Sequence, residues 1–130
     1  MSSTEENSIP KKIYGAARIL RAAKFSYDGF KVMLQEPAFR QELVLFVLLT
    51  PLALFIEVSI IEKILLIFST FFILIVEVLN TSIEAIVDLA SPNYHELAKN
   101  AKDTASLAVL MSVIFSFVVW TLILVTNYIL

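Results

Sequence analysis

The sequence predicts an all-α membrane protein with three transmembrane helices and an amphipathic surface helix before them. Composition gives the first indication: of 130 residues, 58% are hydrophobic and 17% are charged, whereas an average soluble domain is about 45 to 50% apolar and about 25% charged. The second indication is the segment 104–130, which contains no charged side chain and is long enough to cross a bilayer. The third is the helical spacing of apolar and basic residues over 11–35.

Composition also excludes several kinds of functional site. The chain has only two glycines, Gly15 and Gly29, so it lacks the clustered glycines of a Walker loop or a dinucleotide-binding turn. It has no cysteine and a single histidine, His95, which excludes disulfides, thiolate metal sites and multi-histidine metal clusters. A nucleotide, if one is bound, must be held by other means.

The N-terminal part is predicted to lie outside the membrane. Residues 1–10 are polar and are expected to be a disordered terminus. Residues 11–35 are expected to form an amphipathic helix in the plane of the lipid headgroups, because apolar side chains recur every three or four residues with basic ones among them. The alternative is a soluble helix that packs on the protein. The residues with this spacing are Ile13, Ala16, Ala17, Leu20, Ala23, Phe30 and Leu34, and the basic ones are Arg18, Arg21, Lys24 and Lys31.

Three apolar segments are predicted to span the membrane, at residues 39–60, 63–90 and 104–130. Pro37 suits the first turn of the helix that enters the first span. The second span contains no proline or glycine, and a helix over 63–88 is about 38 Å long, which exceeds the roughly 30 Å of hydrocarbon. Residues 91–103 are expected to form a loop. The whole of 11–130 is then one membrane domain.

The distribution of lysine and arginine predicts the orientation of these spans. Most of the ten basic residues precede the first span, only Lys63 lies between the first and second, and Lys99 and Lys102 lie between the second and third. Because loops rich in lysine and arginine stay in the cytoplasm, the N-terminus and the second loop are predicted to be cytoplasmic and the C-terminus external. Trp120 and Tyr128 lie toward the external end, as expected for an aromatic belt.

The second span carries polar residues that are costly in a membrane. Glu77, Asn80, Glu84 and Asp88 are separated by three, four and four positions, which places them on one face of a helix. An ionisable group costs about 2.5 to 3.5 kcal/mol at the centre of a span, so this face predicts a function. Three carboxylates and an amide favour an oxygen-ligand site for Mg²⁺. Glu84 and Asp88 are also near enough to the interface to be merely solvated, and Asn80 also suits a hydrogen bond between helices.

Glu77 is the hardest of these residues to explain as structural. It lies about 21 Å along the helix from Lys63, and no basic residue lies within one turn of it. The residues alone leave two functions open for it, a catalytic carboxylate or part of an ion or proton path.

Five segments give the chain a resemblance to a known family. Residues 77–88 carry the pattern E-x-x-N-x-x-x-E-x-x-x-D, and the other matching segments are 94–99, 101–103, 38–42 and Arg18 to Gly29. Over about residues 16–125 the chain resembles the prokaryotic integral-membrane diacylglycerol kinase family. The resemblance implies ATP-dependent phosphorylation of a lipid alcohol by a homotrimer of three-span protomers in the bacterial cytoplasmic (inner) membrane, with sites shared between protomers and no nucleic acid as partner.

The resemblance also implies roles for individual residues. Glu77 matches the general base that takes the proton of the diacylglycerol hydroxyl, and Glu36 and Glu84 match the ligands of nucleotide-bound Mg²⁺. The positions that match nucleotide contacts are Arg18, Phe25, Glu36, Glu84, Asn93, Tyr94, His95, Lys102 and Asp103. Those that match contacts to the lipid substrate or reacting centre are Arg18, Ser26, Arg40, Glu77, Asn80 and Ser106.

The chain departs from the family pattern at two positions. Phe25 stands where a tyrosine is common, which removes a hydroxyl contact to nucleotide, and Pro37 follows Glu36 where a small residue is usual. The undecaprenol kinase branch shares the same signature and is the near alternative, although 40–42 and 95–97 look more like the diacylglycerol branch. A non-enzymatic proton or cation path, or a purely structural membrane protein, are the alternatives of another class.

Overall fold

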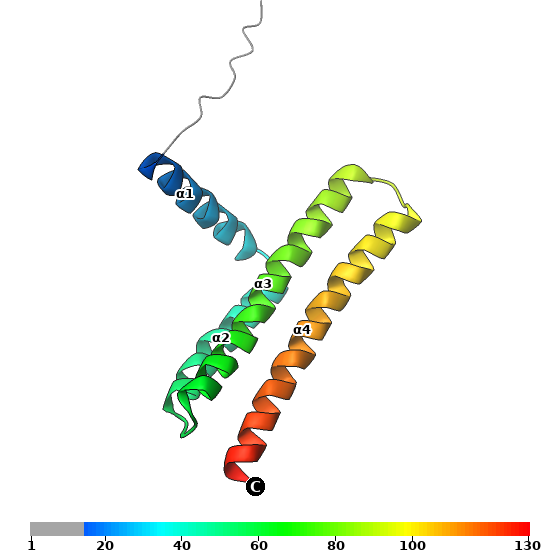
Figure 1. Cartoon of the computed structure of the whole chain (residues 1–130). Coiled ribbons are helices and arrows are strands. Elements are labelled where there is room, and N and C mark those ends of the chain that lie inside the picture. Colours follow the sequence, from blue (N-terminus) through cyan, green and yellow to red (C-terminus); the bar gives the residue numbers. More distant parts are fainter. Residues whose placement is uncertain (1–14) are drawn as a thin grey trace, which may run out of the picture. The chain divides into compact units, whose positions relative to one another are not determined.

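The computed structural model describes residues 15–130. Two parts of the sequence predictions, the disordered terminus over 1–10 and the first residues of the expected surface helix, therefore fall outside the described residues. The described part consists of helices without any strand, which confirms the predicted all-α class (Figure 1). The helices are α1 (Ala16–Met33), α2 (Pro37–Phe55), α3 (Ile60–Ala90) and α4 (Glu96–Tyr128).

The chain divides into two compact units, Met1–Val32 and Met33–Leu130. Nearly all of α1 belongs to the first unit. It begins directly after Gly15, whose φ of +73° is one that residues with a side chain rarely adopt. Apart from Met33 at its end, its large apolar side chains, among them Ile19 and Leu20, are exposed, which is compatible with a helix on a lipid surface. That α1 lies in the headgroup plane stays a prediction.

Helices α2, α3 and α4 are each long and apolar enough to cross a membrane. Pro37 occupies the start of α2, where its missing N–H is not needed by the helix. Helix α3 starts at a capping box, in which Ser59 Oγ accepts from the N–H of Glu62 at 3.3 Å and Glu62 Oε2 accepts from the N–H of Ser59 at 2.8 Å. The local sequence therefore sets where these two helices begin.

Helix α4 begins earlier than the sequence predicts. The sequence predicts a loop over 91–103 and a span over 104–130, whereas in the structure only residues 91–95 separate α3 from α4, which starts at Glu96. His95 caps the helix, because its Nδ1 accepts from the N–H of Leu97 at 3.1 Å. The difference has a physical reason: charged side chains mark where the hydrocarbon ends, but a helix continues into water if it is capped and free of proline and glycine.

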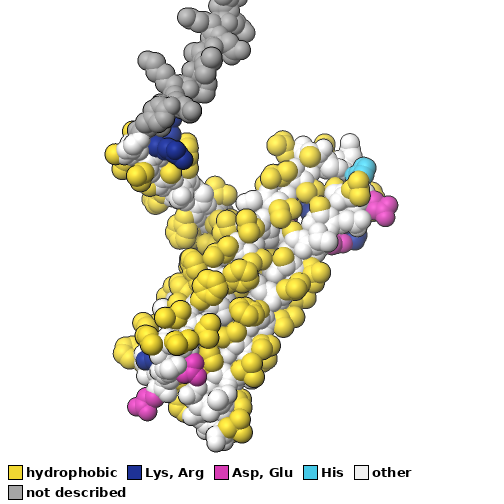
Figure 2. Space-filling model, viewed as in Figure 1, with side chains coloured by type: hydrophobic (Ala, Val, Ile, Leu, Met, Phe, Trp, Pro, Cys, Tyr) yellow, Lys and Arg dark blue, Asp and Glu magenta, His cyan; other side chains and the backbone are white. Residues whose placement is uncertain are grey.

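Helix α3 packs against both α2 and α4, and the α3 to α4 turn lies at the end of the unit opposite the α2 to α3 turn (Figure 1). Two small apolar clusters connect the helices. Met33, Phe39 and Leu74 form one, and Ala53, Leu66 and Ile123 form the other. Figure 2 shows that the visible face of this unit is mostly hydrophobic in its middle, whereas its charged side chains gather at the two ends. Such a surface fits a lipid environment.

Polar contacts fix the register of α3 against α4. Trp120 Nε1 donates to Thr70 Oγ1 at 3.0 Å, and Ser116 Oγ donates to Ser69 Oγ at 3.4 Å. At the end near the α2 to α3 turn, Asn127 Nδ2 donates to Glu62 Oε1 at 2.8 Å. In a membrane the hydrophobic effect does little to hold helices together, so hydrogen bonds between helices help to fix how one helix is aligned along another.

The Trp120 bond gives a test of this register. Thr70→Val keeps the shape of the side chain but removes the acceptor, so we expect the free energy of unfolding to fall by about 0.6 to 1 kcal/mol. Unfolding in mixed micelles, followed by fluorescence of the single tryptophan, measures the change. Thr126→Val is the matched control, because within residues 15–130 the Thr126 hydroxyl bonds only to the carbonyl of Leu122, on its own helix. An equal loss of stability in both variants would contradict the interpretation.

Candidate functional site

The central feature is a cleft bordered by α2, α3 and α4, with a volume of about 590 Å³. We call it the carboxylate cleft. It brings together five residues that the resemblance marked as functional: Glu36, Glu77, Asn80, Glu84 and Ser106. The remaining lining residues are Pro37, Ala38, Glu42, Thr81, Val109, Leu110 and Val113. Residues separated by up to 70 positions thus share one site.

Glu77 is the most enclosed carboxylate of this cleft, with only 5% of its surface exposed. Within residues 15–130 the ion pairs are Lys99 with Asp103 and Lys102 with Asp88, so no cation of the described chain neutralises Glu77. A buried carboxylate without a charged partner is costly. Because the burial of Glu77 brings no evident gain in stability, it indicates a functional role for this carboxylate.

Two acceptor atoms of the carboxylate cleft have no hydrogen-bond partner among the described residues. Glu42 Oε2 and Asn80 Oδ1 are both buried and make no hydrogen bond within residues 15–130. An unsatisfied buried polar atom costs about 1 to 3 kcal/mol, so the cleft is suited to a ligand that supplies donors. We did not assign Glu42 to the site from the sequence. The signal that could have found it is a charge inside a predicted span.

The carboxylates of the cleft can supply some, but not all, of the oxygen ligands that a Mg²⁺ ion needs. Among the described residues, no three histidine, aspartate or glutamate side chains are close enough together to hold a metal ion. Mg²⁺ is commonly held by one or two carboxylates, with phosphate oxygens and water completing the coordination. Glu36 and Glu84 fit that smaller role, because both line the carboxylate cleft. Asp88 does not line this cleft, so the four-residue stripe is divided between two sites.

A second cleft, of about 320 Å³, lies at the turn between α3 and α4. We call it the turn cleft. It contains five predicted nucleotide contacts, Asn93, Tyr94, His95, Lys102 and Asp103, and its other lining residues are Val87, Asp88, Ser91, Pro92, Ala98 and Lys99. The backbone between the two helices holds these side chains together, since only residues 91–95 lie outside helices there.

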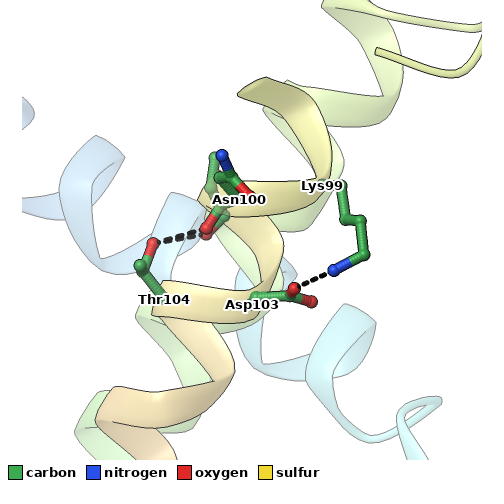
Figure 3. A network of polar contacts seen from close by, with 5 residues as sticks. Lys99, Asn100, Asp103 and Thr104 are labelled. Carbon is green, nitrogen blue, oxygen red and sulfur yellow. Dashed lines mark hydrogen bonds and ion pairs between the residues drawn. The ribbon is translucent and has the colours of Figure 1, made fainter. Parts of the chain in front are cut away.

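Charges in the turn cleft are paired with one another. Lys99 Nζ contacts Asp103 on the same helix, as Figure 3 shows, and Thr104 Oγ1 donates to the Asn100 carbonyl at 2.9 Å beside it. Lys102 Nζ lies 2.7 Å from Asp88 Oδ1, which joins α4 to α3. Ammonium groups bind phosphate readily, so the turn cleft offers both cations and the His95 ring to a nucleotide.

Some predicted site residues lie in neither cleft. Arg40 lines a separate hollow of about 390 Å³ with Pro37, Gln41 and Val44. Arg18, Phe25 and Ser26 lie on α1 in the other unit of the chain. Their contacts with lipid or nucleotide stay predictions.

Comparison with known proteins agrees with the resemblance. The family described as "Prokaryotic diacylglycerol kinase" matches residues 24–124. A protein of Escherichia coli K12 named "Diacylglycerol kinase" is 40% identical, over 88% of this chain and 94% of its own length. Proteins of the same name from Helicobacter pylori 26695 and Pseudomonas aeruginosa are 38% and 43% identical, over 92% and 85% of this chain and over 94% and 90% of their own lengths. The chain therefore belongs to the prokaryotic diacylglycerol kinase family.

Proposed function

We propose that the chain is a lipid kinase that transfers the γ-phosphate of ATP to the primary hydroxyl of 1,2-diacylglycerol and so produces phosphatidic acid. The observation that carries the proposal is the enclosed carboxylate of Glu77, which has no cationic partner among residues 15–130 and lies in a cleft lined by three membrane helices. The names of the curated relatives support the same lipid.

In the proposed reaction, Glu77 acts as general base. Its carboxylate accepts the proton of the lipid hydroxyl while that oxygen attacks the γ-phosphorus, and the bond from that phosphorus to the β–γ bridging oxygen breaks to release ADP. A positioned base contributes about 10²- to 10⁴-fold to such a step. Most of the remaining catalysis in phosphoryl transfer comes from positioning and from charge placed against the phosphates.

In this proposal the water-soluble nucleotide and the lipid substrate approach the site from different sides. The nucleotide binds at the turn cleft, where Lys102 and His95 meet its phosphates and Asn93, Tyr94 and Asp103 complete the contacts. Glu77 lies about 16 Å from Asp88 along α3. For the γ-phosphate to reach Glu77, the triphosphate of the bound nucleotide extends from the turn cleft along α3, past Glu84. The lipid alcohol enters from the hydrocarbon side, near Asn80 and Ser106.

Mg²⁺ is the cofactor in this proposal. It would neutralise charge on the transferred and leaving phosphate groups while Glu36 and Glu84 hold it in place. The carboxylates of these two side chains border the same cleft as Glu77, which supports the assignment. Arg18, Phe25 and Ser26 of α1, and Arg40 of α2, contribute contacts to nucleotide or lipid.

The proposed enzyme is a homotrimer in the bacterial cytoplasmic membrane, with its N-terminus in the cytoplasm and its C-terminus outside. This orientation faces the turn cleft toward cytoplasmic ATP. Neighbouring protomers complete each site. The excess of lysine and arginine before α2 and in the turn region supports the orientation.

Lipid specificity is the decisive test. The full chain is reconstituted in vesicles that contain either diacylglycerol or undecaprenol, and transfer of label from γ-labelled ATP to each lipid is measured. We expect labelled phosphatidic acid. Label on undecaprenol alone would assign the chain to the undecaprenol kinase branch. No label on either lipid, together with proton or cation flux across the vesicle membrane, would favour a non-enzymatic path.

A further inference from the structure

We propose that Asp88 is a positioning residue for nucleotide binding, because its ion pair with Lys102 holds that ammonium group at the turn cleft. The inference rests on the proposed function, in which Lys102 contacts the phosphates of ATP. Asp88 has no such contact of its own in that proposal. Its role is to decide where the Lys102 ammonium lies before the nucleotide arrives.

The ion pair joins two helices across the turn. Asp88 is in the last turn of α3 and Lys102 is in the second turn of α4. The 2.7 Å contact between Lys102 Nζ and Asp88 Oδ1 brings both side chains to the lining of the turn cleft, beside His95. The Lys102 side chain is 38% exposed and that of Asp88 is 66% exposed. The pair is therefore at the mouth of the cleft, within reach of a nucleotide from water.

No carboxylate of α4 within one turn takes the place of Asp88. The residues three or four positions before and after Lys102 are Ala98, Lys99, Ala105 and Ser106. The other ion pair of the cleft is different, because Lys99 and Asp103 are four positions apart on one helix, where helix geometry alone brings them together. Lys102 depends on α3 for its anchor.

An anchored ammonium is better prepared to bind phosphate than a free one. Lysine has a flexible four-carbon stem and three N–H donors. Asp88 engages one donor and leaves two for phosphate oxygens. Since the side chain is already ordered by the ion pair, less conformational entropy is lost when the nucleotide binds.

Charge and position predict opposite effects when Asp88 is neutralised. Removal of a negative charge near a polyanion by itself strengthens nucleotide binding, because repulsion is lost. Loss of the anchor weakens binding, because Lys102 must then be ordered by the nucleotide. The sign of the change in affinity therefore distinguishes a positioning role from a purely electrostatic one.

We expect Asp88→Asn to raise the KM for ATP about two- to fivefold, the range of an exposed ion pair, while kcat stays close to that of the unaltered chain. Binding of a fluorescent ATP analogue to the full chain in vesicles is measured in parallel and should weaken by the same factor. Asp88→Glu retains the charge and should keep most of the affinity. Glu96→Gln is the matched control, because it removes a nearby carboxylate that does not line the cleft.

A double-mutant cycle tests whether Asp88 acts through Lys102. In a Lys102→Met background, Asp88→Asn should cause no further loss of nucleotide affinity. An unchanged or lowered KM in Asp88→Asn alone, or an equal loss in both backgrounds, would overturn the inference. A chain that binds the analogue but phosphorylates no lipid would count against the proposed function only. A chain that binds no nucleotide would overturn both.

Discussion

Glu77→Gln should reduce lipid phosphorylation by about 10²- to 10⁴-fold, the usual contribution of a general base. Glutamine keeps the size and one acceptor oxygen of the side chain but cannot take a proton at the reacting hydroxyl. Nucleotide affinity should be preserved, since Glu77 does not line the turn cleft. Initial rates of labelled phosphatidic acid formation and equilibrium binding of an ATP analogue, measured on the same preparation, separate the two effects.

Glu57→Gln is the control for this substitution. Glu57 is an exposed glutamate outside the helices, in the turn between α2 and α3, and its replacement makes the same chemical change far from both clefts. It should retain full activity. Lipid phosphorylation at a normal rate in the Glu77→Gln protein would remove Glu77 from the role of base. It would leave the family assignment unaffected.

Glu84→Gln should raise the Mg²⁺ concentration needed for half-maximal activity by about tenfold or more, in line with the 10- to 100-fold effects seen when even an outer-shell partner of a metal is lost. The physical reason is that an amide oxygen is a weaker ligand for a hard cation than a carboxylate is. Titration of the kinase rate with Mg²⁺ at saturating ATP measures the shift. Rate lost by the substitution should be partly recovered at high Mg²⁺.

Glu36→Gln should behave in the same way, because Glu36 lines the carboxylate cleft with Glu84. Its Mg²⁺ requirement is the test of whether Pro37 leaves this side chain in a suitable position. Glu57→Gln again serves as control and should have the same Mg²⁺ requirement as the unaltered chain. A lower rate at every Mg²⁺ concentration, without a shift of the midpoint, would contradict a metal-binding role for the altered residue.

The helices could be predicted from the sequence because they depend on local properties. Apolar runs predict the three candidate spans, and Pro37 suits a helix start. The capping box of Ser59 and Glu62 is just as local, but it was found in the structure and not in the sequence analysis. The predicted start of α4 is wrong, because the charged residues after His95 form the first turns of this helix and not a loop. Hydropathy indicates whether a segment lies in lipid or in water, whereas capping and backbone hydrogen bonds determine whether it is helical.

The grouping of polar residues was predicted only in part. A regular helix places Glu77, Asn80 and Glu84 on one face whatever surrounds it, so this part of the carboxylate cleft followed from spacing. The same spacing assigned Asp88 to that group, but in the structure Asp88 lines the turn cleft and pairs with Lys102. Spacing along one helix cannot predict which other helix lies beside each turn.

The sequence by itself determined the helical class, the candidate spans and the face that carries Glu77, because these follow from hydropathy and from the period of one helix. Only the tertiary structure decided that Glu36 and Glu42 share a cleft with Glu77, and that Lys102 is anchored by α3. The physical reason is that a side chain's local partners follow from the turn of its own helix, whereas partners on another helix depend on how the helices pack and in what register.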